Sequence, residues 1–190
     1  CFMEKFSKVS KGEKKINKNT PQEIESSEHV KLIRYKDYDF VEEKDMVIIL
    51  PYFVDEGHIF LRNEFVPTYQ YRYDNENNTM NAFSKYITAI SGTVEDGEKL
   101  NNTVRRELYE EAGIVLSNLF PIEKIKSLFV SKGNCAMYHL YILDIRYNEY
   151  KQVQPPTDGS ISEEKSNTIR VNLGYIDDLN ISDAITALMI

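Results

Sequence analysis

The sequence predicts an α/β protein, and three observations lead to that prediction. The composition is globular, with 42% apolar and 28% charged residues, which excludes a wholly disordered or fibrous protein. Branched and aromatic runs of strand length recur along the chain. Residues 100–112 carry apolar side chains at helical spacing, and Gly113 after them is a frequent helix stop. A chain of 190 residues is long enough for one domain with a modest extension.

The first 29 residues differ from the rest of the chain. Lysines are interspersed there with serine, asparagine, threonine and glutamate, and apolar residues are few. We expect a solvated, poorly ordered arm, with a targeting arm or a partner-binding arm as the alternatives. Residues 30–41 are expected to hold a short strand or hairpin. The predicted organisation is an extension over residues 1–45 and a folded domain over residues 46–190.

The predicted core begins at Met46. Residues 46–54 (MVIILPYFV) form a branched and aromatic run that indicates a buried strand, residues 55–57 form a turn, and residues 58–65 form the partner strand of a hairpin. The later elements alternate with polar loops. They are a loop at 73–81, a strand at 85–91, the helix at 100–112, strands at 125–131, 136–147 and 169–171, a loop at 151–166 and an amphipathic closing helix at 181–190.

Charge and composition narrow the class of partner. The formal charge of −7 disfavours binding to a nucleic-acid backbone, so we expect no double-stranded nucleic acid. An anionic substrate would then be bound through a metal cation. The apolar runs are too short for a membrane span, and no secretory signal is expected. Two cysteines form no disulfide framework, which favours a reducing, cytoplasmic location, and few histidines disfavour a zinc site.

The predicted helix carries a carboxylate within its apolar stripe. On a helical wheel, Glu111 lies about 20° and Glu107 about 60° from Val104, which is itself part of the stripe. A buried carboxylate must be neutralised, paired or bound to a metal. The stripe is formed by Leu100, Val104, Leu108 and Ala112.

Glu110 lies further round on the same side of this helix, so three glutamates cluster there. Clustered carboxylates repel one another without a cation, and hard oxygen ligands of this kind suit Mg²⁺ or Mn²⁺. Arg106 is placed to hold one of the carboxylates. The alternative is a solvated acidic helix face that pairs with Arg105 and Arg106.

The loop before the helix completes a longer motif. Gly92 and Gly97 bracket an acidic turn, and glycines allow the tight loop that would bring Glu98 toward the helix glutamates. The whole segment resembles the signature of the Nudix hydrolases: Gly, five residues, Glu, seven residues, then Arg-Glu-aliphatic-x-Glu-Glu-x-Gly-aliphatic. A match of this length is far more specific than most short motifs. The matching residues are Gly92, Glu98, Arg106, Glu107, Leu108, Glu110, Glu111, Gly113 and Ile114.

The resemblance implies an α/β/α sandwich with a mixed β-sheet and a Nudix pyrophosphohydrolase activity on a nucleoside diphosphate linked to another moiety. It implies Mg²⁺ or Mn²⁺ held by Glu107 and Glu111, with Glu110 and Glu98 as further ligands or a base. Arg106 would orient the glutamates. Such metals polarise phosphoryl oxygens and activate a bound water for attack on phosphorus. We also expect Gly92 to contact the substrate.

Residues 46–190 most resemble the ADP-ribose pyrophosphatase branch of these enzymes. The shared features are the strand at 59–65, the motif, Ser131-x-Gly133 and the terminal segment at 182–188. The chain departs from the branch at Lys132, where proline is usual, and at Phe65, where arginine is frequent. The candidate phosphate contacts are therefore Arg62, Arg72 and Lys132, and a nucleobase could stack on Tyr69, Tyr71 or Tyr73. Surface charge and core packing remain the respective alternatives.

Two further expectations come from the same branch. A glutamate on the loop before the last strand, Glu163 or Glu164, would help activate the attacking water, with a solvated loop charge as the alternative. A homodimer is expected, with residues 30–45 as a candidate interface strand. The preferred substrate is ADP-ribose or a related nucleotide sugar. The alternatives are a dinucleoside polyphosphate, NADH or a capped RNA end, or a catalytically silent nucleotide sensor.

Overall fold

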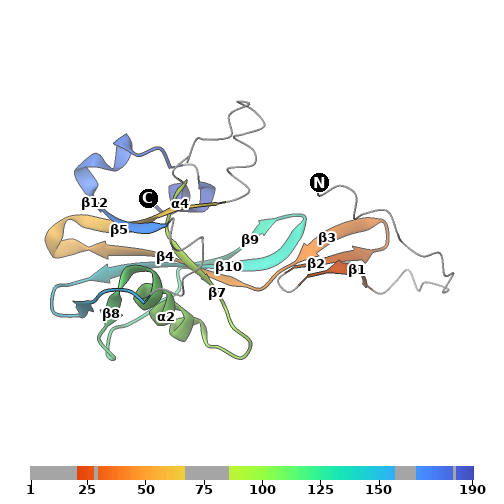
Figure 1. The fold of residues 1–190 in the computed structure, drawn as a ribbon, viewed down its shortest axis with the longest axis horizontal. Helices are drawn as coiled ribbons and strands as arrows, with labels where there is room; N and C mark the ends of the chain where they lie inside the picture. The colour runs from red at the N-terminus through yellow and green to blue at the C-terminus, as the bar shows by residue number, and fades with distance from the viewer. Residues whose placement is uncertain (1–20, 28–29, 67–85, 157–165, 182) are drawn as a thin grey trace. The chain divides into compact units, whose positions relative to one another are not determined.

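The computed structural model describes residues 21–27, 30–66, 86–156, 166–181 and 183–190 (Figure 1). The chain divides into unit 1, residues 1–43 with 131–135, and unit 2, residues 44–130 with 136–190. In chain order the described elements are β1 (Gln22–Ser26), β2 (Lys31–Tyr35), β3 (Tyr38–Glu42), β4 (Met46–Phe53), η2 (Val54–Glu56), β5 (His58–Glu64), β6 (Tyr86–Thr88), β7 (Ile90–Thr93), α2 (Leu100–Ala112), β8 (Ile114–Leu116), β9 (Lys126–Ser131), β10 (Asn134–Ile145), β11 (Tyr150–Gln152), β12 (Asn167–Asn172), η3 (Leu173–Asp178) and α4 (Ala184–Met189).

Unit 1 contains three antiparallel strands in the order β1-β2-β3. The hairpin of β2 and β3 lies where a strand or hairpin was expected. The expectation of a poorly ordered arm up to residue 29 is wrong for residues 22–26, which form β1. This strand is polar and mostly exposed, so its sequence has no strand pattern. Main-chain pairing with β2 creates it, and composition does not report such pairing. The arm's residues 1–20 lie outside the described residues.

The sheet of unit 2 is built around β4. Strand β10 runs parallel to β4, from the pair Tyr138 and Met46 to the pair Ile145 and Phe53. Strand β5 is antiparallel to the end of β4, and β12 is antiparallel to β5. The sheet is therefore mixed. Strand β4 has neighbours on both edges and cover on both faces, which explains its nearly continuous apolar sequence.

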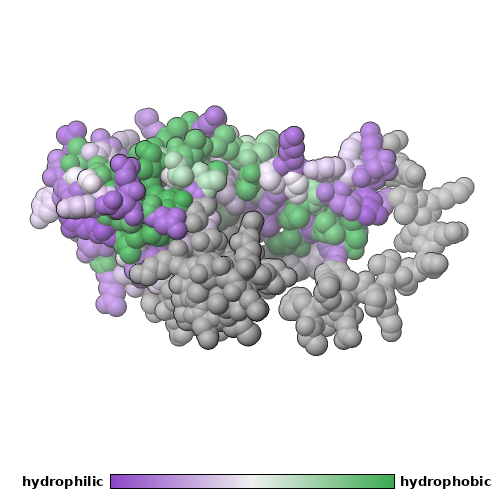
Figure 2. Space-filling view, turned by 90° about the horizontal axis from the view of Figure 1, so that it is seen from above, coloured by the Kyte–Doolittle hydropathy of each residue, from purple (hydrophilic) through white to green (hydrophobic). Residues whose placement is uncertain are grey.

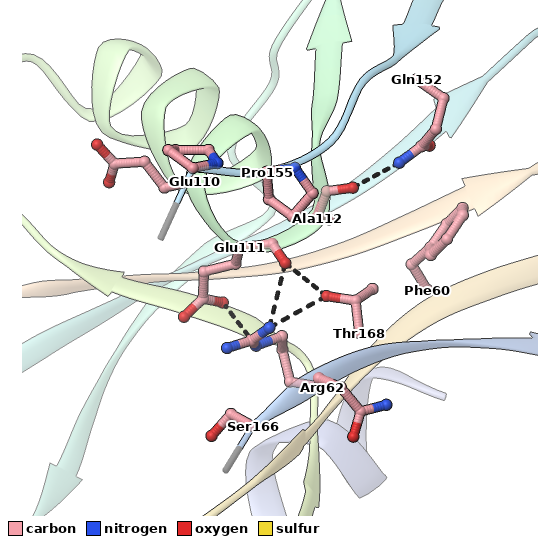
Figure 3. Close-up of a pocket in the computed structure, with 11 residues that line it drawn as sticks. Phe60, Arg62, Glu110, Glu111, Ala112, Gln152, Pro155, Ser166 and Thr168 are labelled. Atoms are coloured by element: carbon pink, nitrogen blue, oxygen red, sulfur yellow. Dashed lines mark hydrogen bonds and ion pairs between the residues drawn. The ribbon is translucent and has the colours of Figure 1, made fainter. Parts of the chain in front are cut away.

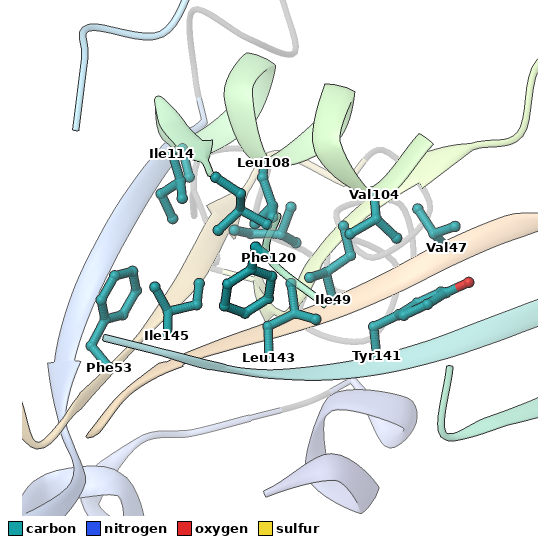
Figure 4. Packing of buried hydrophobic residues seen from close by; sticks show 13 residues of the cluster. Val47, Ile49, Phe53, Val104, Leu108, Ile114, Phe120, Tyr141, Leu143 and Ile145 are labelled. Carbon is teal, nitrogen blue, oxygen red and sulfur yellow. The ribbon is translucent and has the colours of Figure 1, made fainter. Parts of the chain in front are cut away.

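Two apolar clusters cover the two faces of this sheet. Alternate residues of β4 point to opposite faces, so Val47 and Ile49 join one cluster, whereas Ile48 and Leu50 join the other. The first cluster packs beneath α2 and includes residues of β8 and β10 (Figure 4). The second includes Met189 of α4. Figure 1 shows α2 and α4 on opposite sides of the sheet. The expected α/β/α sandwich with a mixed β-sheet is thereby confirmed.

The observed boundaries of helices and strands agree best with the predicted ones where the apolar sequence pattern is longest. Helix α2 spans the predicted residues and ends at Gly113, whose φ of 64° is left-handed. The predicted strand at 85–91 is divided into β6 and β7, and the closing helix is the shorter α4. The pair β8 and β11 was not predicted, and β11 occupies the start of the expected loop at 151–166. Strands of three residues carry no readable periodicity, because their partners come from elsewhere in the chain.

The sheet forks beside α2. The start of β4 pairs with β7, from Met46 to Ile49, whereas only Tyr52 and Phe53 at its end pair with β5. The second half of β5 pairs with β6 instead. Strands β5 and β7 therefore pair with different parts of the same edge of β4 and then separate from each other. We call the place where they separate, with no strand between them, the fork. Helix α2 contacts both β7 and β12, so it spans this fork.

The surface is mixed in polarity. Figure 2 shows apolar and hydrophilic residues interspersed on one face of the molecule. Leu188 of α4 and Tyr175 of η3 are among the exposed large apolar residues. Scattered exposure of this kind is normal for globular proteins. None of the helices within the described ranges combines the length and apolar character that a membrane crossing requires.

Candidate active site

Glu107 lies directly against the backbone of Gly92. Glu107 is on the third turn of α2 and is only 6% exposed, whereas Gly92 is on β7. A Cβ atom added to Gly92 would lie 1.8 Å from Cδ of Glu107 and 1.9 Å from its Oε1. No residue but glycine leaves room for this carboxylate. We expected Gly92 to contact a substrate. In the structure, its missing side chain leaves the space at the fork of the sheet that the Glu107 carboxylate fills.

Arg106 holds three carboxylates at once. Its Nη1 donates to Oε1 of Glu107 at 2.5 Å and to Oε2 of Glu110 at 3.0 Å. Its Nε and Nη2 donate to the two carboxylate oxygens of Glu98, at 3.2 and 3.0 Å. Nη2 also donates to the carbonyl of Thr93 at 2.8 Å, which ties the arginine to β7. The planar guanidinium suits this task, because it presents its donors in a rigid fork.

Glu98 and Glu110 are engaged with this arginine rather than free. The hydrogen bond from Arg106 lowers the pKa of Glu98 to about 2. A general base works best when its pKa lies near the operating pH, so the contacts of Glu98 suit it to hold Arg106. Glu110 lies on the outer side of α2, and its side chain is 42% exposed.

Two carboxylates, those of the buried Glu107 and the half-buried Glu111, are short of positive charge. Burial raises the pKa of Glu107 to about 7, against the opposing effect of Arg106. Burial also raises the pKa of Glu111 to about 8, and Arg62 offsets this only in part. The backbone N–H of Ser91 contacts Oε2 of Glu111 at a long 3.4 Å. A cation between these carboxylates would lower both pKa values, because it stabilises their ionised forms.

The helical wheel does not show how far each carboxylate is exposed to solvent. It placed Glu111 nearer to the apolar stripe, yet the side chain of Glu107 is 8% exposed and that of Glu111 is 21% exposed. The wheel describes one helix alone. The missing side chain of Gly92 on the facing strand makes the space that Glu107 fills.

Glu107 and Glu111 face a common cavity of about 420 Å³ at the fork of the sheet. Arg62 and Glu64 of β5 also line this cavity. Burial raises the pKa of Glu64 as well. Within the described ranges, no three His, Cys, Asp or Glu side chains are gathered as a metal-binding group. The pair of Glu107 and Glu111 nevertheless fits a hard divalent cation, since both offer carboxylate oxygens with too little neutralising charge.

A second cavity of about 360 Å³ is also lined by Glu111 and Arg62 (Figure 3). Phe60, Gln152 and Thr168 are among the residues that line it. Sequence reasoning missed Glu64, Gln152 and Thr168. The alternation of β5 could have identified Glu64, because residues 62 and 64 of one strand share a face. No local pattern could have identified the other two, since they reach α2 from separate strands.

Of the remaining candidates, only Lys132 lies within the described residues. Lys132 lies in unit 1, in the turn between β9 and β10, where its carbonyl accepts a hydrogen bond from the hydroxyl of Tyr38 at 2.9 Å. The other candidates lie outside the described residues. These are Arg72, Glu163 and Glu164, together with Tyr69, Tyr71 and Tyr73.

Comparisons with known proteins show the family and the fold of this chain. The family model described as the NUDIX domain matches residues 47–165. Among curated proteins, none matches the chain. A crystal structure of an ADP compounds hydrolase is similar in fold, with a TM-score of 0.60 and 13% identity, over 89% of this chain and 86% of that chain. At that identity the likeness concerns the fold.

Proposed function

This chain belongs to the NUDIX domain family and is a pyrophosphohydrolase of nucleoside diphosphate compounds, and we propose that it uses Mg²⁺ or Mn²⁺ to hydrolyse ADP-ribose or a related nucleotide sugar. The observation that carries the proposal is that Glu107 and Glu111, two carboxylates with little neutralising charge and with pKa values raised by burial, line one cavity. If these carboxylates had only a structural role, their burial would lower the stability of the folded protein with no compensating interaction.

Glu107 and Glu111 are the proposed metal ligands, with Glu110 as a further ligand. When bound, the cation supplies polarisation of the phosphoryl oxygens and a more acidic water. Arg106 keeps Glu107 and Glu110 in place through its hydrogen bonds. Glu98 secures Arg106 from the loop before α2. This division of labour leaves Glu107 and Glu111 facing the cavity.

The proposed base lies outside the motif, at Glu164 or Glu163. Glu98 is a weak candidate for that role, because its lowered pKa of about 2 makes it a poor proton acceptor near neutral pH. Arg72 and Lys132 are proposed as phosphate contacts. Residues 46–190 are proposed as the catalytic domain and residues 1–45 as its extension, in a cytoplasmic homodimer.

Support for ADP-ribose comes from the sequence features shared with that branch of the family and from the fold likeness to an ADP compounds hydrolase. A dinucleoside polyphosphate, NADH or a capped RNA end would be bound through the same diphosphate and remain the alternative substrates. A silent nucleotide sensor is the alternative outside enzymes, although four intact motif glutamates favour turnover.

The test is hydrolysis of ADP-ribose by the full chain with Mg²⁺, followed by phosphatase and a phosphate assay. The panel includes the alternative substrates, and the Glu111→Gln variant serves as the matched control. Hydrolysis of ADP-ribose that requires both the metal and Glu111 supports the proposal. If nothing in the panel is hydrolysed while ADP-ribose raises the melting temperature, the chain is a sensor.

A further inference from the structure

Side chains from three strands secure the last turn of α2. The final carbonyls of a helix lack partners within the helix. The carbonyl of Glu111 accepts a hydrogen bond from Oγ1 of Thr168 on β12 at 2.5 Å and from Nη1 of Arg62 on β5 at 3.1 Å (Figure 3). The next carbonyl, that of Ala112, accepts from Nε2 of Gln152 at 2.6 Å. The turn that carries Glu111 is therefore held from outside the helix.

Arg62 reaches both the backbone and the side chain of Glu111. Its Nε lies 3.5 Å from Oε2 of Glu111 and 3.7 Å from Oε1 of Glu64, so it forms ion pairs but no hydrogen bond there. Its Nη1 also donates to Oγ1 of Thr168 at 3.2 Å. Arg62 is only 8% exposed. The charge at the C-terminal end of α2 also complements the helix dipole.

We propose that Arg62 is a positioning residue that, together with Thr168, sets where the carboxylate of Glu111 lies in the cavity. The two residues clamp the peptide oxygen of Glu111 between β5 and β12, and the guanidinium fixes the direction of the carboxylate. This role replaces the phosphate contact expected for Arg62, because Nη1 is already occupied by two protein oxygens. The inference rests on the proposed function, in which Glu111 is a metal ligand.

A variant of Thr168 distinguishes a positioning role of Arg62 from direct binding of phosphate by Arg62. Thr168→Val keeps the shape of the residue and the charge of Arg62, yet it removes the hydrogen bond from Thr168 to the carbonyl of Glu111 and the one from Arg62 to Thr168. If Arg62 instead contacted phosphate directly, that change would alter KM, because Nη1 loses its bond to Thr168, and Mn²⁺ binding without substrate would stay normal. Arg62→Lys keeps a positive charge but loses the rigid, planar guanidinium that reaches both the carbonyl and the carboxylate of Glu111. Positioning therefore predicts that both variants have the same kind of defect.

The experiment measures Mn²⁺ affinity without substrate, and kcat and KM for ADP-ribose at saturating Mg²⁺. Thr168→Val and Arg62→Lys should each weaken Mn²⁺ binding roughly three- to tenfold, the usual effect of one lost hydrogen bond, and lower kcat with KM unchanged. Arg170→Met is the matched control, because Arg170 is an exposed arginine of β12 that bonds to Glu56. It should match the wild type. If both variants bind Mn²⁺ as the wild type does and only KM rises, Arg62 is a phosphate contact and the proposal is overturned.

Hydrogen exchange of the metal-free protein keeps this test separate from the proposed function. If the wild type binds no Mn²⁺ and hydrolyses nothing, the proposed function fails, but the clamp is still measurable. Amides of the last turn of α2 should then exchange several-fold faster in Thr168→Val and Arg62→Met than in the wild type, while amides of β4 stay unchanged. Equal exchange in that turn would overturn the clamp itself.

Discussion

Gly92 of β7 and Glu107 of α2 lie so close together that a Cβ atom at position 92 would be 1.8 Å from the carboxyl carbon of Glu107. We therefore expect Gly92→Ala to displace Glu107 and lower kcat by roughly 10²-fold, since a shift of about 1 Å can cost that much. Overpacking should also cost about 1–3 kcal/mol of unfolding free energy. Gly133→Ala is the control, because its Cβ would meet only Oγ of Ser131, at 4.0 Å. Equal kcat in the two variants would contradict this account.

Glu111→Gln should lower kcat at least about 10²-fold, because it removes the charge of a metal ligand and keeps its volume. The metal-free variant should be no less stable than the wild type at neutral pH, since burial already favours the neutral form of Glu111. Steady-state kinetics and thermal unfolding measure the two effects. The exposed Glu123→Gln variant is the control. Full activity of Glu111→Gln would remove the metal-ligand assignment.

Arg106→Lys should lower kcat or Mg²⁺ affinity by roughly 10–100-fold, the usual cost of losing a residue that orients metal ligands. A lysine cannot serve Glu98, Glu107 and Glu110 together, because it lacks the planar fork. Arg105→Lys is the neighbouring control. Arg105 bonds to the carbonyls of Ser117 and Phe120, so its loss should affect stability alone. A kinetic titration of Mg²⁺ decides, and unaltered kinetics in Arg106→Lys would refute the orienting role.

Acidification should destabilise the protein partly through His58. This histidine is 2% exposed, stacks on Phe53 and has no hydrogen-bond partner on either ring nitrogen. Burial lowers its pKa below 6.5, with a further lowering by Arg170 and an opposite effect of Glu56. The stability it contributes is fully present above pH 6.5 and is lost as the pH falls through the folded-state pKa. Urea unfolding of His58→Phe should show a smaller loss between pH 7 and pH 5 than the wild type shows. Identical pH slopes would mean that His58 does not titrate in this way.

The chain should form a homodimer, as the resemblance to the ADP-ribose pyrophosphatase branch implies. Light scattering at micromolar concentration should then give a mass near twice 22.1 kDa. A mass near 22.1 kDa would show a monomer and contradict the prediction.

Patterns within short stretches of the sequence were enough for the helix at 100–112, its end at Gly113, the buried strand β4 and the family motif. Each depends on residues close in the chain, where side-chain periodicity and backbone freedom act directly. The tertiary structure alone decided that the side chain of Glu107 is less exposed to solvent than that of Glu111, because the space comes from Gly92 on another strand. It also decided that Arg62 and Thr168, 106 residues apart in the chain, converge on one carbonyl of α2. Strand pairing across long separations brings such residues together, and no local periodicity records which strands will pair.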